Sequence, residues 1–130
     1  MEVVKDGYAK FSVGDIAGFL DLVHDDMEWE VHDVTAPVPF AGHLSGKPAV
    51  IKFFEHLKSF QIFKYEVQAF YGKGSEIAAV GQLDAKTLTT GKEYHGDWLQ
   101  VWKIKDGKIA SWDEFYQNPE NLVAAYTDDA

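Results

Sequence analysis

The sequence predicts a single α+β domain in which helices cover one face of an antiparallel sheet. Apolar residues recur with a helical period in the first third of the chain, whereas the stretch from Phe60 to Gln117 alternates with a period of two between turn signals. The length of 130 residues suits one domain that buries its own core. We therefore assign residues 1–130 to one domain.

Two helices are expected at the start of the chain. Val4, Tyr8 and Phe11 lie at i, i+4 and i+7, so they form one apolar stripe on a first helix. A second helix is expected from Asp15, which can cap it, to about His24.

A strand, a loop and a third helix follow. From Met27 the hydrophobic period changes to two, because Trp29 and Val31 continue the alternation, and this indicates a half-buried strand. Residues 33–46 contain two prolines and two glycines and are expected to form an ordered loop. Pro48 suits the first turn of a third helix.

Four strands and a final helix complete the predicted order. Turns are expected at 72–75 and 89–92, and the dipeptide Asp106-Gly107 between two apolar runs is a strong hairpin signal. Pro119 is placed to open a last short helix.

The charge and the composition exclude several function classes. Asp and Glu number 21 against 12 Lys and Arg, which gives a formal charge of −9, and no basic surface for nucleic acid is visible. The absence of cysteine excludes a disulfide scaffold and a thiolate nucleophile. The five histidines show no metal-binding spacing, so neither a metal nor another cofactor is expected. No apolar run could span a membrane and no signal peptide is apparent, so a cytoplasmic protein without a membrane partner is expected.

Aromatic residues make up 15% of the chain, and the last two strands predict that many of them line a pocket. Alternation within these strands places six large side chains on one face: Trp98, Gln100, Trp102, Trp112, Glu114 and Tyr116. A filled core is an equally good interpretation of that face. The opposite face, with Ile109, Asp113 and Phe115, also carries apolar groups, so a second copy of the chain is expected to cover it in a homodimer.

Glu114 and Gln100 are the candidate catalytic residues. A carboxylate among rings should have its pKa raised by desolvation, which suits a general acid or base near neutral pH; the alternative for Glu114 is a structural carboxylate. Gln100 can orient a substrate carbonyl or a water molecule, or it can be a buried amide that bonds to a neighbouring strand. The residues predicted to bind a small apolar ligand are Trp29, Val31, Phe40, Tyr94, Trp98, Trp102, Trp112 and Tyr116.

The other polar candidates are expected at the surface. Alternation turns His95 and Asp97 outward, so an exposed pair is favoured over a catalytic relay. His32 and His43 flank the loop, and we expect both to be exposed rather than catalytic.

Several segments resemble SnoaL-like proteins of the nuclear transport factor 2-like superfamily. They are YAKFSVGD at 8–15, LVHDDMEW at 22–29, PFAG at 39–42, GKPAV at 46–50, DGKI at 106–109 and EFY at 114–116. The resemblance extends from about Val3 to Tyr126. It implies a cone-shaped, curved antiparallel sheet that encloses a pocket with three helices and dimerises through its outer face.

The resemblance to ketosteroid isomerase does not extend to its catalytic residues. That enzyme uses a carboxylate base, a tyrosine and a protonated aspartic acid, and the matching positions here are Val31, Gly7 and Gln100. Tyr8 lies one position from Gly7, which matches the catalytic tyrosine of that enzyme. Because a shift of one residue turns a strand side chain to the opposite face, we do not place Tyr8 in the site. The resemblance implies a cofactor-free acid–base enzyme, of isomerase, cyclase or dehydratase type, acting on an apolar polyketide- or steroid-like substrate. The alternative is a non-catalytic ligand-binding or protein-interaction domain of the same fold.

Overall fold

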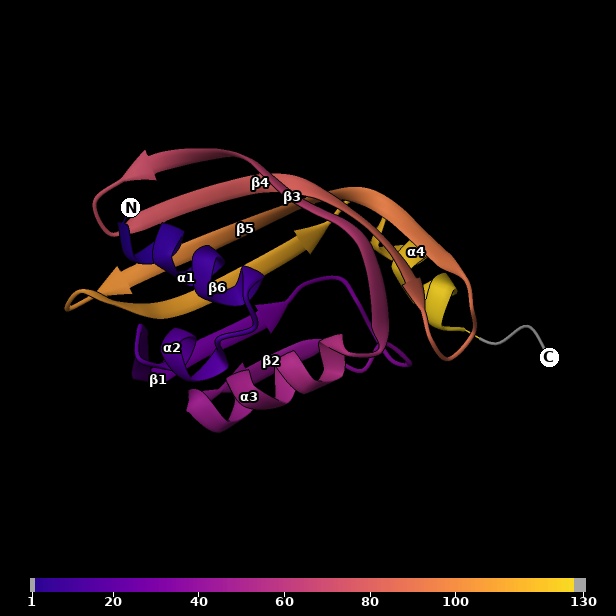
Figure 1. Ribbon diagram of the computed structural model, residues 1–130, viewed down its shortest axis with the longest axis horizontal. Helices are drawn as coiled ribbons and strands as arrows, with labels where there is room; N and C mark the ends of the chain where they lie inside the picture. Colours follow the sequence, from indigo (N-terminus) through magenta and orange to yellow (C-terminus); the bar gives the residue numbers. More distant parts are fainter. Residues whose placement is uncertain (1, 128–130) are drawn as a thin grey trace.

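One curved sheet and four helices make up the computed structural model, which describes residues 2–127 (Figure 1). The helices are α1 (Glu2–Ser12), α2 (Ile16–Leu20), α3 (Gly46–Leu57) and α4 (Pro119–Tyr126). The strands are β1 (Val23–Val31), β2 (Gly42–Ser45), β3 (Phe60–Lys73), β4 (Glu76–Thr87), β5 (Glu93–Lys105) and β6 (Lys108–Tyr116). This confirms the predicted α+β class.

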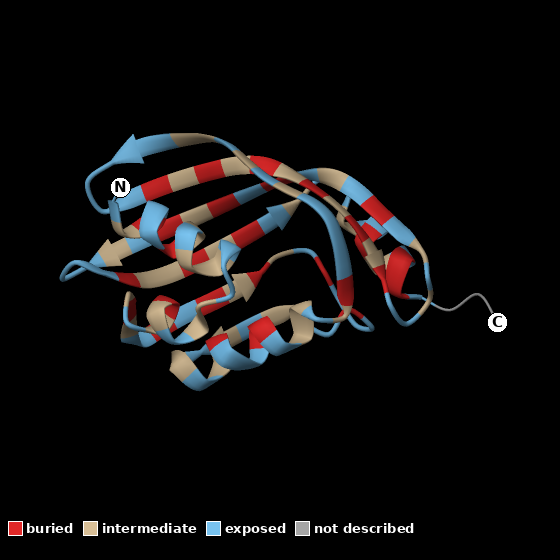
Figure 2. Ribbon diagram, in the orientation of Figure 1, coloured by how far each residue is buried: buried red, intermediate tan, exposed pale blue. Residues whose placement is uncertain are grey.

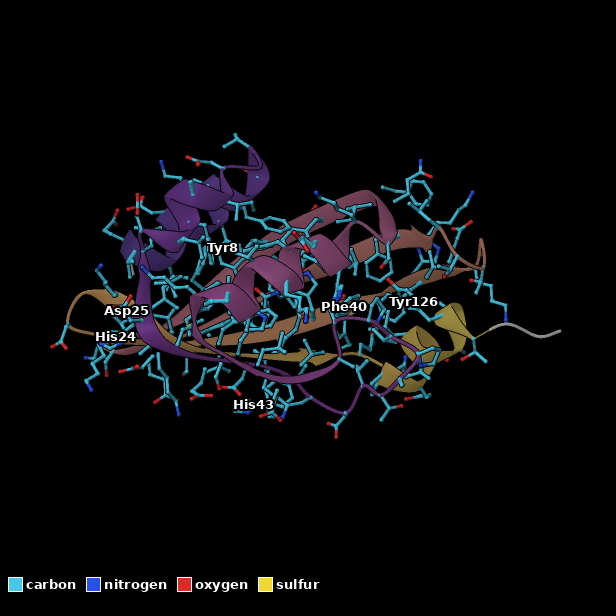
Figure 3. All side chains as sticks on the ribbon, turned by 90° about the horizontal axis from the view of Figure 1, so that it is seen from below. Tyr8, His24, Asp25, Phe40, His43 and Tyr126 are labelled. Atoms are coloured by element: carbon cyan, nitrogen blue, oxygen red, sulfur yellow. The ribbon has the colours of Figure 1, made fainter. Side chains whose placement is uncertain are left out.

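The six strands follow the order β2-β1-β6-β5-β4-β3 in the sheet. The last four strands of the chain form the predicted antiparallel meander. The strands β1 and β2 pair with each other in antiparallel fashion. They join the meander at β6, with β1 parallel to β6, and not at β3, which follows β2 in the sequence. Helices α1, α2 and α3 lie on one side of the sheet, and α4 lies at its far end (Figures 1 and 3).

Two predicted boundaries near the start of the chain are wrong. The second helix ends at Leu20 rather than near His24, and Val23 belongs to β1, where it pairs with Ile109 of β6 and is fully buried. The predicted loop also contains a strand, β2, whose residue Leu44 pairs with Trp29. In both places pairing with a distant strand decides the local structure, and a local hydrophobic period does not reveal such pairing.

The outward position predicted for Ile109 is also wrong. Lys103 of β5 pairs with Ser111, while the next residue, Ile104, pairs with Ile109, so Ala110 is an extra residue on β6. Such a bulge shifts the alternation by one position. Ile109 therefore turns inward and is fully buried.

The core lies on the helix-covered side of the sheet. Buried and more exposed residues alternate along β4, β5 and β6, as Figure 2 shows. All four tryptophans are at most 3% exposed. The outer face is less covered, and Leu99 and Phe115 are each 36% exposed there. No helix in the described part of the chain is long and apolar enough to cross a membrane.

Candidate active site

A cavity of about 50 Å³ lies between the sheet and the first three helices. Phe11 of α1, Phe19 of α2 and Phe54 of α3 close it on the helix side. The predicted site residues that line it are Trp29, Gln100, Trp102, Trp112, Glu114 and Tyr116. The other predicted ligand-binding residues, which are Val31, Phe40, Tyr94 and Trp98, are buried in the core but do not line this cavity.

Glu114 and Gln100 meet at the polar centre of the cavity. They lie opposite each other on β6 and β5, and Gln100 Nε2 donates a hydrogen bond of 2.5 Å to Glu114 Oε2. Glu114 is 3% exposed and Gln100 is 2% exposed, so water does not screen this contact.

Gln100 also joins two tyrosines to this centre. Its Nε2 donates to the Tyr65 hydroxyl at 3.1 Å, and its Oε1 accepts a short hydrogen bond from the Tyr8 hydroxyl. Tyr8 in turn accepts a hydrogen bond of 3.0 Å from the Trp102 indole. These contacts use the donors and acceptors of the Gln100 amide and hold it in one orientation.

The surroundings of Glu114 favour its protonated form. Burial raises the pKa of its carboxyl from 4.5 to about 7, and hydrogen bonding from Tyr116 and Gln100 opposes part of that rise. The Tyr116 hydroxyl is near enough to lower this pKa, yet Oε1 of Glu114 has no partner within hydrogen-bond geometry among residues 2–127. Gln100 thus holds one carboxylate oxygen, and no group in the described part of the chain holds the other.

Burial also keeps the neighbouring tyrosines protonated. It raises the pKa of Tyr8, and the negative charge of Glu114 adds to the rise. It raises the pKa of Tyr65 and of Tyr116 well above the ordinary value. Their hydroxyls therefore act as hydrogen-bond donors at neutral pH.

A groove of about 490 Å³ between α1 and β3 adjoins the cavity. Tyr8, Phe11, Ile62 and Tyr65 line both spaces and form the wall between them. The Phe11 ring lies 5.5 Å from the Tyr65 ring and 5.6 Å from the Phe54 ring, so it bridges α1, β3 and α3. The residues of this wall therefore separate the cavity from the groove.

Sequence reasoning missed Tyr8 and Tyr65. The argument that a one-residue shift reverses a side chain holds for strands, but Tyr8 is on a helix, where the apolar stripe of Val4 and Phe11 already indicated its inward direction. Tyr65 lies between two irregularities of the β3–β4 register, at Ile62/Lys64 and Val67/Ala69, which disturb simple alternation.

The polar residues predicted to lie outside the pocket do lie outside it. His95 bonds to Asp84 at 2.7 Å and to Glu93 at 2.9 Å, and these contacts raise its pKa. Figure 3 places His43 on the side of the sheet away from the helices.

Three residues of metal-ligand type also come together on the outer face. His32 bonds to Asp113 at 2.8 Å and to Glu30 at 3.2 Å. One ligand atom from each of the three residues lies within 4.8 Å of the other two. Strand pairing brings them together, so the spacing of these residues in the sequence does not reveal the group. The contacts of His32 with both carboxylates account for the cluster.

A family profile described as the SnoaL-like domain matches residues 4–112. The chain belongs to this SnoaL-like family. No curated protein is significantly similar to it. The family assignment agrees with the curved sheet and the cavity between the sheet and the helices.

Solved structures share the same fold at low sequence identity. A nuclear transport factor 2-like protein from Burkholderia xenovorans is 24% identical, with 97% of this chain and 94% of that chain covered and a TM-score of 0.86. TerC, co-crystallised with polyporic acid, is 20% identical, with 97% of each chain covered and a TM-score of 0.80. A candidate SnoaL-like polyketide cyclase from Mesorhizobium loti is 21% identical, with 88% of this chain and 97% of that chain covered and a TM-score of 0.72. These structural similarities show the fold of the SnoaL-like chain. At such low sequence identities its chemistry has to be argued from the site.

Proposed function

We propose that this SnoaL-like chain is a cofactor-free acid–base enzyme of isomerase, cyclase or dehydratase type. The observation that carries the proposal is Glu114, a buried carboxyl with a pKa of about 7 and one unpartnered oxygen in a cavity lined by rings. At neutral pH both protonation states of such a group are populated, so it can remove a proton from a substrate and return it elsewhere.

Of the two tyrosines that contact Gln100, Tyr65 is the better placed to support that proton transfer. The Tyr8 proton is directed at Gln100, whereas Tyr65 accepts from Gln100 and has only a long contact of 3.5 Å as a donor. Its proton is therefore available to a substrate oxygen that gains negative charge when Glu114 removes a proton. Gln100 then acts by holding Glu114 and Tyr65 in place rather than by transferring a proton.

The substrate that this site favours is a small, largely apolar molecule with flat surfaces, because aromatic rings form most of the cavity wall. The relation to a candidate polyketide cyclase and to a protein crystallised with polyporic acid supports a polyketide-like substrate. A steroid-like substrate is the other flat, apolar class that we propose. This substrate class is part of the proposal.

Hydrogen–deuterium exchange tests the proposal without knowledge of the natural substrate. The protein is incubated in D₂O with β-tetralone or androstenedione, and exchange at the carbon next to the carbonyl is followed by NMR. We expect wild-type protein to accelerate exchange and Glu114→Gln to abolish at least 99% of that acceleration, because general acid–base catalysis contributes roughly 100-fold or more. Glu76→Gln is the control, since Glu76 is exposed at the start of β4. Full exchange activity in Glu114→Gln would overturn the assignment.

The size of the cavity favours a second candidate function, that of a non-catalytic ligand-binding domain. Sites for drug-sized ligands have volumes of roughly 300–1,000 Å³, and this cavity of about 50 Å³ must expand to admit such a molecule. In the same experiment, binding of β-tetralone without exchange would support this second function.

We further propose that the chain forms a homodimer through the outer face of the sheet. Register pairs place four residues side by side across four strands, and we call them the outer apolar row: Ala69, Val80, Leu99 and Phe115. The His32 ring stacks on Phe115 at 4.4 Å and extends the row toward β1. A second copy of the same face would cover these apolar groups.

A further inference from the structure

The cavity holds three buried polar atoms that the protein leaves without a hydrogen bond. Within residues 2–127 the indole nitrogens of Trp29 and Trp112 and Oε1 of Glu114 have no partner, and all three residues line the cavity. The third cavity tryptophan, Trp102, differs because its indole donates to Tyr8. The unsatisfied set is thus two donors and one acceptor.

Trp29 and Trp112 form a single unit. They are register partners on the parallel strands β1 and β6, and their rings stack with centroids 4.1 Å apart and planes 23° apart. Trp29 is 2% exposed and Trp112 is 3% exposed, so bulk water does not reach their indole groups. A buried donor without an acceptor destabilises the folded state, and a molecule in the cavity that supplies an acceptor removes that penalty.

We propose that Trp29, Trp112 and Glu114 form the hydrogen-bonding part of a binding site for a planar phenol or enol. Its oxygen accepts hydrogen bonds from the indole N–H groups, and its hydroxyl donates to Glu114 Oε1 when that carboxyl is ionised. The rings of Phe19 and Phe53 pack around the Trp29 side of this unit and provide an apolar surface for the flat carbon skeleton. The inference rests on the proposed function only in using the same cavity, and it concerns binding rather than turnover.

The affinity ratio between phenol and toluene tests this inference. The two probes have nearly the same shape, but only phenol carries the oxygen, so the ratio cancels the effect of any space that a substitution creates. We expect wild-type protein to prefer phenol and expect Trp29→Phe and Trp112→Phe each to reduce the ratio about five-fold, the effect of one lost hydrogen bond.

Trp98→Phe is the matched control. The Trp98 indole is also buried and unpartnered among the described residues, but it does not line the cavity and packs against Tyr65 instead. Its substitution should leave the phenol-to-toluene ratio unchanged. An equal fall in all three variants, or a wild-type protein that does not prefer phenol, overturns the inference.

NMR of the four indole N–H groups gives a second measurement on wild-type protein, so the test does not depend on every variant folding. Each Trp→Phe variant that folds assigns one signal by its loss, and the remaining signal follows by elimination. Phenol should shift the signals of Trp29 and Trp112 more than that of Trp98. Phenol binding that leaves both cavity signals unmoved overturns the inference, whereas exchange activity in Glu114→Gln would overturn only the proposed function.

Discussion

The raised pKa of Glu114 affects both the chemistry of the site and the stability of the fold. Its folded-state pKa of about 7 lies above the value of 4.5 that it has when exposed, so the folded protein binds this proton more tightly than the unfolded chain does. The resulting stabilisation is complete below about pH 4.5 and is lost as the pH rises through about 7. A shift of this size corresponds to about 3 kcal/mol.

Urea unfolding of wild-type protein and Glu114→Gln at pH 5 and pH 8 measures this contribution. The difference in unfolding free energy between the two proteins should favour wild type by about 2.5 kcal/mol more at pH 5 than at pH 8. The comparison removes the contribution of exposed histidines, because both proteins contain them. A difference that does not change with pH would contradict the burial-driven shift.

Gln100 controls the same titration through its hydrogen bond. Gln100→Leu keeps a similar volume but removes the donor to Glu114 Oε2, so the pKa of Glu114 should rise further. It also leaves the buried hydroxyls of Tyr8 and Tyr65 without their amide partner, which should lower stability by about 2 kcal/mol. Difference infrared spectroscopy of the carboxyl band follows the midpoint directly, and a midpoint at or below that of wild type would exclude this role.

At the scale of elements, α1 and β3 control access to the cavity. Phe11 is the ring that bridges them and that lines both the cavity and the adjoining groove. Phe11→Ala should join the two spaces and expose the cavity tryptophans, so acrylamide should quench tryptophan fluorescence more strongly than in wild type. We expect a stability cost of up to about 3 kcal/mol, because the ring is only half-buried.

Phe63→Ala is the control for this effect. Phe63 is on β3 but is 53% exposed and lines neither space. Equal quenching of both variants would mean that Phe11 does not separate the cavity from solvent.

The elements also explain how far the sequence predicts the site. Glu114 and Gln100 were predicted together because β5 and β6 are consecutive strands, so alternation and one hairpin are enough to bring them side by side. The helical stripe of Val4 and Phe11 indicates the inward direction of Tyr8, but its contact with Gln100 depends on how α1 packs on the sheet. Tyr65 reaches the same point from a strand with an irregular register, which local periodicity does not reveal. The strand β2 and the inward turn of Ile109 depend on strand pairing and on a bulge in the β5–β6 hairpin, which a hydrophobic period does not reveal either.

At the scale of the whole molecule, the outer apolar row and the net charge act in opposite directions on self-association. Covering Leu99 and Phe115, each 36% exposed, favours a dimer. The formal charge of −9 on each copy opposes it. Salt screens this repulsion over a distance of about 8–10 Å near physiological ionic strength, so we expect the dimer to weaken at low ionic strength and to strengthen as salt is added.

Sedimentation equilibrium across a salt series measures this balance. Leu99→Asp places a charge in the outer apolar row and should produce a monomer at every salt concentration, because pairing the faces would bury one unpaired carboxylate from each copy. Leu88→Asp adds the same charge at a residue that is 60% exposed in the turn between β4 and β5, and it should leave the dimer intact. If Leu99→Asp dimerises as wild type does, the outer apolar row is not the interface. A monomeric wild-type protein at high salt, where the repulsion is screened, would show that covering the outer apolar row is too weak to hold two copies together.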